Sequence, residues 1–172
     1  AGKGSAGLKK GSCYTIATNT TTITDDLRFV NNTCVEEGTG ENAIETCISV
    51  SALLANITNV VLSDITLTTS ASGDTDAIII DGGPGYTSQV DIYDLTHNGG
   101  GRITDLDATQ NPHQITLWNP TIDYTGTTHL NAVSALNIYG GTISKGGGSG
   151  STVTLIGDYP RTIQGVNFLD CA

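Results

Sequence analysis

Six segments of the chain share one pattern of hydrophobic and polar positions. Positions one and three are apolar in nearly every segment, position five is Asn, Asp or Gly, and position seven is Thr in all but the last. Successive segments start 33, 30, 25, 21 and 25 residues apart. The segments are residues 27–34, 60–67, 90–97, 115–122, 136–143 and 161–168. Such a repeat indicates a solenoid whose coils carry loops of different length.

The pattern within each segment predicts two strands joined at a bend. The first four positions alternate inward and outward with the period of a β-strand, and position five tolerates a left-handed bend. A short second strand follows at positions seven and eight. A third strand is predicted in most intervals, at residues 44–48, 77–80, 102–104, 130–133 and 153–156. Three short strands per repeat predict an all-β fold, a right-handed parallel β-helix of about six coils.

Stacking such coils brings equivalent positions into columns along the axis. The inward columns are expected to form the core, and they include Val60, Val90, Ile115 and Leu136 together with Leu62, Ile92, Leu117 and Ile138. Each buried aliphatic side chain contributes about 1.5–3 kcal/mol, so a single coil cannot offset the entropy of ordering its backbone. The coils are therefore expected to fold as a stack.

The coil pattern resembles that of the pectate-lyase-like superfamily of right-handed parallel β-helix proteins. This superfamily includes polysaccharide lyases, polygalacturonases and phage tailspikes. The resemblance covers residues 27–168 and implies the architecture rather than any one activity. A β-sandwich or jelly roll is the competing fold, because short Gly-rich strands suit it too. Recurrence of Thr and of Asn, Asp or Gly in columns is something a sandwich does not require.

The predicted organisation is one domain with an N-terminal arm. Residues 1–26 are expected to form an extended arm that is flexible and basic at first and then Thr-rich, and residues 27–172 the β-helix domain. Lys3, Lys9 and Lys10 are three of only seven basic residues, whereas the chain has seventeen acidic ones. The first dozen residues are therefore a basic, Gly-rich segment on an acidic body.

Net charge and cysteine content indicate which partners are excluded and in which compartment such a protein is expected. A formal net charge of −10 argues against nucleic acid or an anionic membrane surface as the partner, and the chain has no apolar stretch that could span a membrane. Four cysteines, few lysines and an N-terminal Ala that suits a removed signal peptide favour a secreted, extracellular protein. Sequons at Asn19, Asn31 and Asn56 make it a candidate glycoprotein.

An aromatic strip is the first candidate site. The outward position four reads Val30, Ser63, Tyr93, Trp118, Tyr139 and Gln164. Tyr93, Trp118 and Tyr139 would therefore lie on one face in three consecutive coils, with Asp91 beside Tyr93. Exposed rings of this kind hold a sugar or a protein partner. Loops that cover the rings are the alternative.

Catalytic chemistry has weaker support. His97, Asp91, Asp94 and Arg102 are close in sequence, but Asp94 occupies the bend position and His97 an inward column of apolar residues. The paired Asp motif of polygalacturonases, followed by its His-Gly and Arg-Ile-Lys elements, is absent. Structural roles explain these residues better, so no catalytic residue is assigned and a non-enzymatic protein is favoured.

No metal site or cofactor is assigned either. Asp74, Asp76, Asp105 and Asp107 form two pairs of carboxylates in neighbouring coils. Calcium is the cation that such oxygens would attract, but solvation of loops is the simpler interpretation, because a calcium site needs more ligands.

Chain geometry limits how the four cysteines pair. Cys34 and Cys47 lie in the first coil and its exit, whereas Cys171 lies about five coil steps, or roughly 24 Å, further along the axis. A disulfide needs Cα atoms within roughly 7 Å, so Cys34 with Cys47 is feasible. This pairing leaves Cys13 with Cys171, although three pairings of the four cysteines are formally possible. The arm would then run back along its own body or link head-to-tail to the next subunit.

The leading functional hypothesis is a secreted structural protein. Open strand edges at both ends of a β-helix favour a homo-oligomer or polymer, assembled through the ends and the N-terminal arm into an extracellular filament, sheath or appendage. The alternatives are a small carbohydrate-binding or polysaccharide-degrading β-helix protein and a fragment of a phage-type receptor-binding spike.

Overall fold

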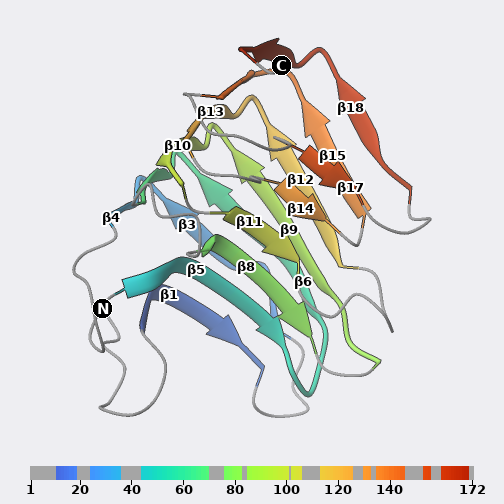
Figure 1. Ribbon diagram of the computed structural model, residues 1–172. Coiled ribbons are helices and arrows are strands. Elements are labelled where there is room, and N and C mark those ends of the chain that lie inside the picture. Colours follow the sequence, from blue (N-terminus) through green and yellow to red (C-terminus); the bar gives the residue numbers. More distant parts are fainter. Residues whose placement is uncertain are drawn as a thin grey trace.

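The structure is a computed structural model that describes most of the repeated segments. The described residues are 11–18, 24–35, 44–69, 76–82, 85–100, 102–105, 113–125, 130–132, 135–145, 153–155 and 160–170. Every regular element among them is a β-strand. Within these ranges, no helix has the length and apolarity needed to cross a membrane. Figure 1 shows the strands advancing from β1 at the bottom to β18 near the top.

The strands form three sheets, here called sheets A, B and C. Sheet A contains β1 (Gly11–Ala17), β5 (Ile44–Ala52), β8 (Asp76–Gly82), β11 (Arg102–Asp105), β14 (Leu130–Ala132) and β17 (Val153–Leu155). Sheet B contains β2 (Thr24–Asp25), β3 (Arg28–Val30), β6 (Ile57–Ser63), β9 (Ser88–Tyr93), β12 (Gln114–Trp118), β15 (Ala135–Tyr139) and β18 (Thr162–Gln164). Sheet C contains β4 (Thr33–Val35), β7 (Thr66–Thr68), β10 (Thr96–Gly99), β13 (Thr121–Tyr124), β16 (Thr142–Lys145) and β19 (Asn167–Leu169).

The chain visits the three sheets in the same order again and again. Each passage through A, B and C is called a rung, and the next rung adds one strand to the same edge of every sheet. All pairings among the described strands are parallel, for example those of β9 with β12 and of β12 with β15. The protein is therefore all-β with parallel sheets, as a parallel β-solenoid is. The β-sandwich alternative is wrong, because antiparallel strand pairs are its basis.

The predicted core columns are confirmed. Equivalent residues pair in register from rung to rung, as Val60 does with Val90 and Ile115 with Leu136. Both predicted inward columns are at most 1% exposed from the second rung to the fifth. The third strand of the repeat, predicted in the intervals, is also present as β5, β8, β11, β14 and β17. A dry aliphatic interior thus runs between the three sheets.

The corner between sheets B and C is the most regular feature of the backbone. Position five of the repeat has a positive φ in every rung, between 51° and 69°. Its amide N–H also donates to a carbonyl oxygen of the next rung, as Asp94 does to Trp118 at 2.9 Å and Asn119 to Tyr139 at 2.7 Å. The corner residues are Asn31, Asp64, Asp94, Asn119, Gly140 and Gly165. The predicted left-handed bend is confirmed, and it keeps successive rungs hydrogen-bonded around the turn.

One glycine at this corner is required by space as well as by conformation. Gly141 has a φ of +78°, and a Cβ atom there would overlap the backbone of Pro120 in the preceding rung. Gly140 has a φ of +66° but open space around its missing Cβ. Close approach of neighbouring rungs therefore demands glycine at position 141, whereas position 140 demands only a left-handed conformation, which Asn also adopts.

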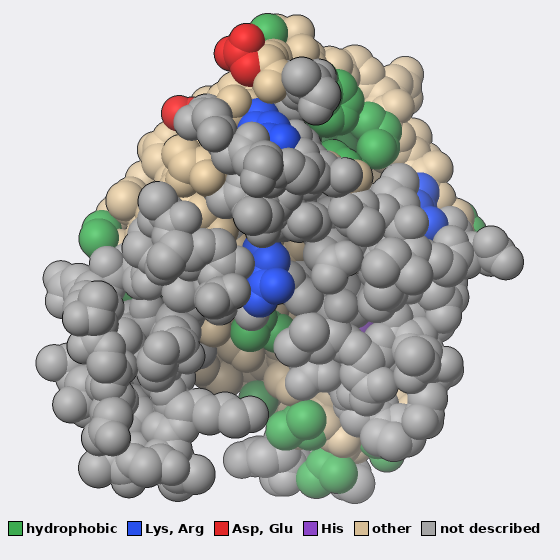
Figure 2. All heavy atoms as spheres, in the orientation of Figure 1, with side chains coloured by type: hydrophobic (Ala, Val, Ile, Leu, Met, Phe, Trp, Pro, Cys, Tyr) green, Lys and Arg blue, Asp and Glu red, His purple; other side chains and the backbone are tan. Residues whose placement is uncertain are grey.

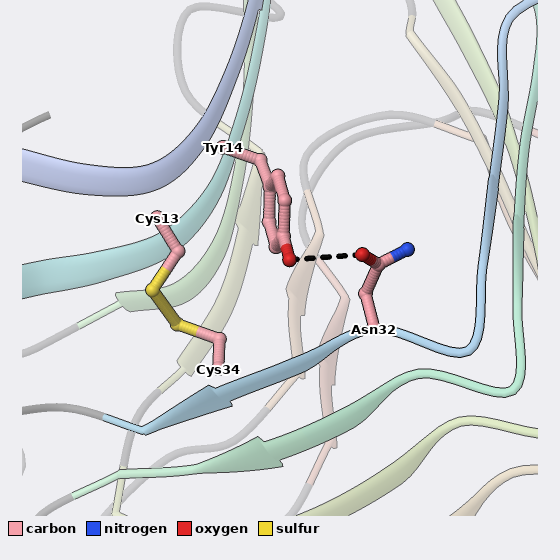
Figure 3. Close-up of a disulfide and its surroundings, with 4 residues drawn as sticks. All are labelled: Cys13, Tyr14, Asn32 and Cys34. Atoms are coloured by element: carbon pink, nitrogen blue, oxygen red, sulfur yellow. Dashed lines mark hydrogen bonds between the residues drawn. A yellow bond between two sulfur atoms is a disulfide. The ribbon is translucent and has the colours of Figure 1, made fainter. Parts of the chain in front are cut away.

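Residues 11–17, assigned from the sequence to the arm, form β1 and pair with β5 at the edge of sheet A. The disulfide joins Cys13 on β1 to Cys34 on β4, with Cα atoms 6.3 Å apart (Figure 3). The predicted pairings of Cys34 with Cys47 and of Cys13 with Cys171 are therefore wrong. They placed Cys13 in a free arm, whereas β1 brings Cys13 beside Cys34.

Side chains close the first rung as well. The Tyr14 hydroxyl on β1 donates a hydrogen bond to Oδ1 of Asn32 at 2.9 Å, as Figure 3 shows. The Tyr14 ring also packs against Phe29, with ring centroids 5.9 Å apart. The disulfide and these contacts tie β1 to β3 and β4. These contacts stabilise the first rung, which among the described strands has a neighbouring rung on one side only.

Candidate functional site

Tyr93, Trp118 and Tyr139 form a continuous ladder on the outside of sheet B. They are the last residues of β9, β12 and β15, and the parallel register places Trp118 directly between the other two. The rings of Tyr93 and Trp118 have centroids 5.8 Å apart and planes 6° apart. Those of Trp118 and Tyr139 are 4.4 Å and 18° apart. The predicted alignment of the three side chains is confirmed, and this set is called the aromatic ladder below.

Stacking determines which ring surfaces remain available. Trp118 has a tyrosine over each of its faces, so it presents its edge to solvent. Its Nε1 donates a 3.5 Å hydrogen bond to Oδ1 of Asp91 on the neighbouring strand β9. Tyr93 is 38% exposed. Sugars stack on the open faces of aromatic rings. Because the rings of the ladder cover one another, the ladder offers a sugar less open ring surface than three separate exposed rings would. Its geometry suits adhesion between rungs.

A polar groove follows the B–C corner of the first three rungs. It has a volume of about 460 Å³ and is lined by Asn31, Thr33, Asp64, Thr66, Asp94 and Thr96. The carboxylates in it already accept hydrogen bonds from the protein. Oδ1 of Asp94 accepts from Asn119 Nδ2 at 2.8 Å, and Oδ2 of Asp64 from the Ser63 hydroxyl at 3.0 Å. These contacts stabilise the corner, in keeping with the structural role expected for Asp94.

The residues considered for catalysis lie on different sheets. Asp91 is on sheet B, His97 on sheet C and Arg102 on sheet A, paired with Asp76. His97 points inward between Leu67 and Ile122 and is fully buried. The structure thus gives no common pocket for this group among the described residues.

His97 is nevertheless unusual, because it is a titratable group in an aliphatic column. Its Nε2 lies 3.0 Å from the hydroxyl of Thr69, a contact that satisfies the ring within the core. Burial lowers the pKa of His97 to about 4. The imidazole is therefore neutral at physiological pH, since burial disfavours the charged form.

Only some of the remaining predicted site residues lie within the described part of the chain. Asn31 and Asn56 are exposed, and Oδ1 of Asn56 accepts a hydrogen bond from the Thr87 amide at 3.0 Å. Asn19, Cys171, Asp74 and Asp107 lie outside the described residues, as do the side chains of Asp76 and Asp105. The sequons and the suggested calcium ligands therefore stay predictions.

Comparison of the chain with protein-family models, with curated proteins and with solved structures finds no match. The site must accordingly be interpreted from its own geometry.

Open strand edges were predicted at both ends of the solenoid, but the exposed apolar side chains of the last rung were not. Ile163, Phe168 and Leu169 are 41%, 42% and 44% exposed, although Ile163 and Phe168 occupy inward columns. A signal was present, because the last repeat carries Arg161 where the other repeats have an aliphatic residue. A charged residue in an inward column is typical of a sheet edge.

The ladder predicts an energetic coupling between its rings. Replacing Trp118 and Tyr139 with Ala, singly and together, is expected to give a coupling free energy of about 0.5–1.5 kcal/mol in urea unfolding, because stacked rings contribute that much beyond their buried area. The pair Tyr93 and Tyr139, which are separated by Trp118, is the matched control and should be additive. Additive effects for Trp118 and Tyr139 would contradict a stabilising stack.

His97 predicts acid sensitivity in a defined window. Between pH 6.5 and about 4 the unfolded chain binds a proton at this residue that the folded protein does not. Stability should therefore fall through this window, by on the order of 3 kcal/mol in total, and level off below it. The variant His97→Leu, which matches the neighbouring Leu67, should lose this slope in denaturation measured across the window.

A separate carboxylate effect provides the internal reference. Hydrogen bonds from Thr58 and Asn59 lower the pKa of Asp25 below its ordinary value of 3.8. Protonation of Asp25 therefore affects stability only at more acid pH, and it does so equally in the unmodified protein and in His97→Leu. An unchanged slope between pH 6.5 and about 4 in His97→Leu would show that His97 is not the buried base described here.

Proposed function

We propose that this chain is a secreted structural subunit that assembles end to end into an extracellular filament, sheath or appendage. In this proposal the parallel sheets belong to a right-handed β-helix of about six coils, similar to the pectate-lyase-like superfamily in architecture. The crossovers that join parallel strands are almost always right-handed, which supports that hand. The function lies in the shape and the two ends of the solenoid rather than in a catalytic pocket.

The exposed last rung carries the proposal. Ile163 continues a column in which Leu117 and Ile138 are fully buried, yet 41% of its own surface is exposed. Figure 2 shows hydrophobic side chains at the upper end of the molecule, in the region where Figure 1 places β18. Strands β17, β18 and β19 are also the last described strands of their sheets. Apolar surface and strand edges that coincide at one end favour a partner that supplies another rung.

A second copy has the matching surface at its opposite end. Phe29 and Leu27, both half-buried, begin the columns that Ile163 and Arg161 end. Strand β3 of one copy stacked on β18 of another would continue the parallel ladder at the strand spacing of about 4.8 Å. The two surfaces differ from each other, so the contact is head-to-tail. Contacts of this kind propagate into open filaments unless a rotation closes the ring.

Two further observations support placement outside the cell. The Cys13–Cys34 disulfide is a bond that persists in oxidising compartments. Asn31 and Asn56 of the sequons are exposed, so attached glycans would project into solvent.

Carbohydrate binding is the second candidate, and Tyr93 is the observation that favours it. This ring caps the aromatic ladder, is 38% exposed and has Asp91 nearby on the same strand. A sugar ring stacked on Tyr93 would resemble one more member of the ladder. Trp118 itself offers no such place, because a tyrosine lies over each of its faces.

End-to-end assembly predicts that one charge at the exposed rung blocks polymerisation. The variant Ile163→Lys should stay dispersed where the unmodified protein forms filaments in negative-stain electron microscopy. Burying an uncompensated ammonium group costs several kcal/mol, which raises the concentration needed for assembly by about a hundredfold or more. Thr68→Lys adds the same charge to the exposed lateral surface of β7 and is the matched control, expected to assemble normally.

Circular dichroism and thermal unfolding of both variants verify that the subunit itself is folded. Discrete particles of the unmodified protein at high concentration would contradict the proposal, and trimers among them would favour the receptor-binding spike. Filaments of Ile163→Lys with an unchanged threshold concentration would show that the exposed rung is not the contact.

A further inference from the structure

Three cysteines meet at one corner of the first two rungs. The Sγ atoms of Cys13, Cys34 and Cys47 all lie within 4.8 Å of one another. Cys13 and Cys34 form the disulfide, and Cys47 carries a thiol. In the described part of the chain, no other group of three or more His, Cys, Asp or Glu side chains has its ligand atoms gathered in this way. A thiol held beside a disulfide is the arrangement that thiol–disulfide exchange requires.

The register of the strands explains why the three sulfurs meet. Ser12 pairs with Thr46 and Tyr14 with Ile48, so Cys13 on β1 lies opposite Cys47 on β5. Neighbouring strands are about 4.8 Å apart, which places the two side chains within contact distance. Cys34 reaches the same corner from β4, where it occupies the inward column of sheet C. The cluster therefore follows from the fold and not from one flexible side chain.

Burial distinguishes the three sulfur atoms. Cys34 and Cys47 are 2% and 1% exposed, whereas Cys13 is half-buried on β1, the outermost described strand of sheet A. A thiol on Cys13 would therefore be much more accessible to an external reagent than a thiol on Cys47. The pairing of the cysteines decides which of these two residues carries it.

We propose that Cys47 exchanges with the disulfide, and that Cys13 is thereby a covalent attachment site for a thiol compound or partner. The Cys47 thiolate attacks Sγ of Cys34, the bond between Cys34 and Cys13 breaks, and Cys13 leaves as a thiolate. One S–S bond replaces another and one thiolate replaces another, so this step involves no net oxidation; the proton that Cys47 loses to form its thiolate goes to solvent. The Cys13 thiolate then attacks an external disulfide, forms a mixed disulfide with one half and releases the other half as a thiolate.

The fold tolerates both pairings. Cys34 stays bonded in either isomer, first to β1 and then to β5. Strand β1 keeps its hydrogen-bonded register with β5 when the covalent tie moves. Exchange thus loosens the first rung only at Cys13, where the attached group would sit at the edge of sheet A.

Oxidised glutathione is the probe that tests this assignment. The folded, unmodified protein is incubated with it at about pH 8.5, near the usual pKa of a thiol, then quenched in acid and mapped by non-reducing peptide mass spectrometry. The expected product carries glutathione on Cys13 together with a Cys34–Cys47 disulfide. Its rate of formation should rise by up to about tenfold per pH unit below the thiol pKa, because the thiolate is the attacking species.

Two variants separate exchange from direct modification. Cys47→Ala removes the attacking thiol and should give no adduct, with the disulfide retained. Cys13→Ser, whose Cys34 and Cys47 are both thiols, should form the Cys34–Cys47 disulfide when oxidised glutathione is added as the oxidant, with two equivalents of reduced glutathione released, which shows directly that the second pairing fits the fold. Far-ultraviolet circular dichroism confirms that each variant is folded.

Three results would overturn the proposal: glutathione on Cys47 with the Cys13–Cys34 bond intact, no adduct on the unmodified protein, or an adduct on Cys13 in Cys47→Ala. The peptide map reports on single chains. Its outcome is therefore independent of whether the subunits polymerise.

Discussion

The hydrogen bonds around the B–C corner are the constraint on which the rest of the structure depends. At this corner the left-handed residue of each of the first five rungs donates its amide N–H to a carbonyl oxygen of the rung that follows. In most turns, backbone N–H and C=O groups form hydrogen bonds with water. At this corner they pair with the neighbouring rung instead, so the hydrogen-bond ladder continues from sheet B into sheet C. Because the bend occurs at the same position in every rung, residues on both sides of it stay in register. One-residue slips, which would turn aliphatic side chains outward, are thereby excluded.

Because the rungs stack in register, equivalent positions of the repeat form columns, and each column has its own chemical character. Inward columns become a dry aliphatic core, and His97 is buried there at the cost of a depressed pKa. On the outside of sheet B the same stacking brings Tyr93, Trp118 and Tyr139 face to face. At the last rung it leaves apolar side chains without a following layer among the described strands. Core, ladder and open end are thus three consequences of one arrangement.

Much of this fold was predictable because each repeat encodes its own local geometry. The period-two alternation identified the strands of sheet B, and the column of Asn, Asp and Gly identified the bend that Asp94 and Asn119 make. The alignment of the aromatic residues followed from the same register. These features depend on residues a few positions apart and on stacking of equal units, both of which can be recognised in a sequence.

The features that escaped prediction depend on contacts outside the repeat. Strand β1 precedes the first recognisable segment, so neither its place in sheet A nor the proximity of Cys13 to Cys34 could be inferred. Ring orientation was also beyond the pattern, which placed Trp118 outside without showing that its faces are covered. Side-chain packing of this kind depends on rotamers, and a column of residue types does not specify them.

The hydrogen bonds at the B–C corner can be observed directly. In isotope-labelled protein, scalar couplings across hydrogen bonds should connect the amide nitrogens of Asp94, Asn119 and Gly140 to the carbonyl carbons of Trp118, Tyr139 and Gln164, respectively. Detection of these three couplings is the result that rungs stacked in register predict. Couplings to other carbonyl groups, or rapid solvent exchange of all three amides, would contradict the account.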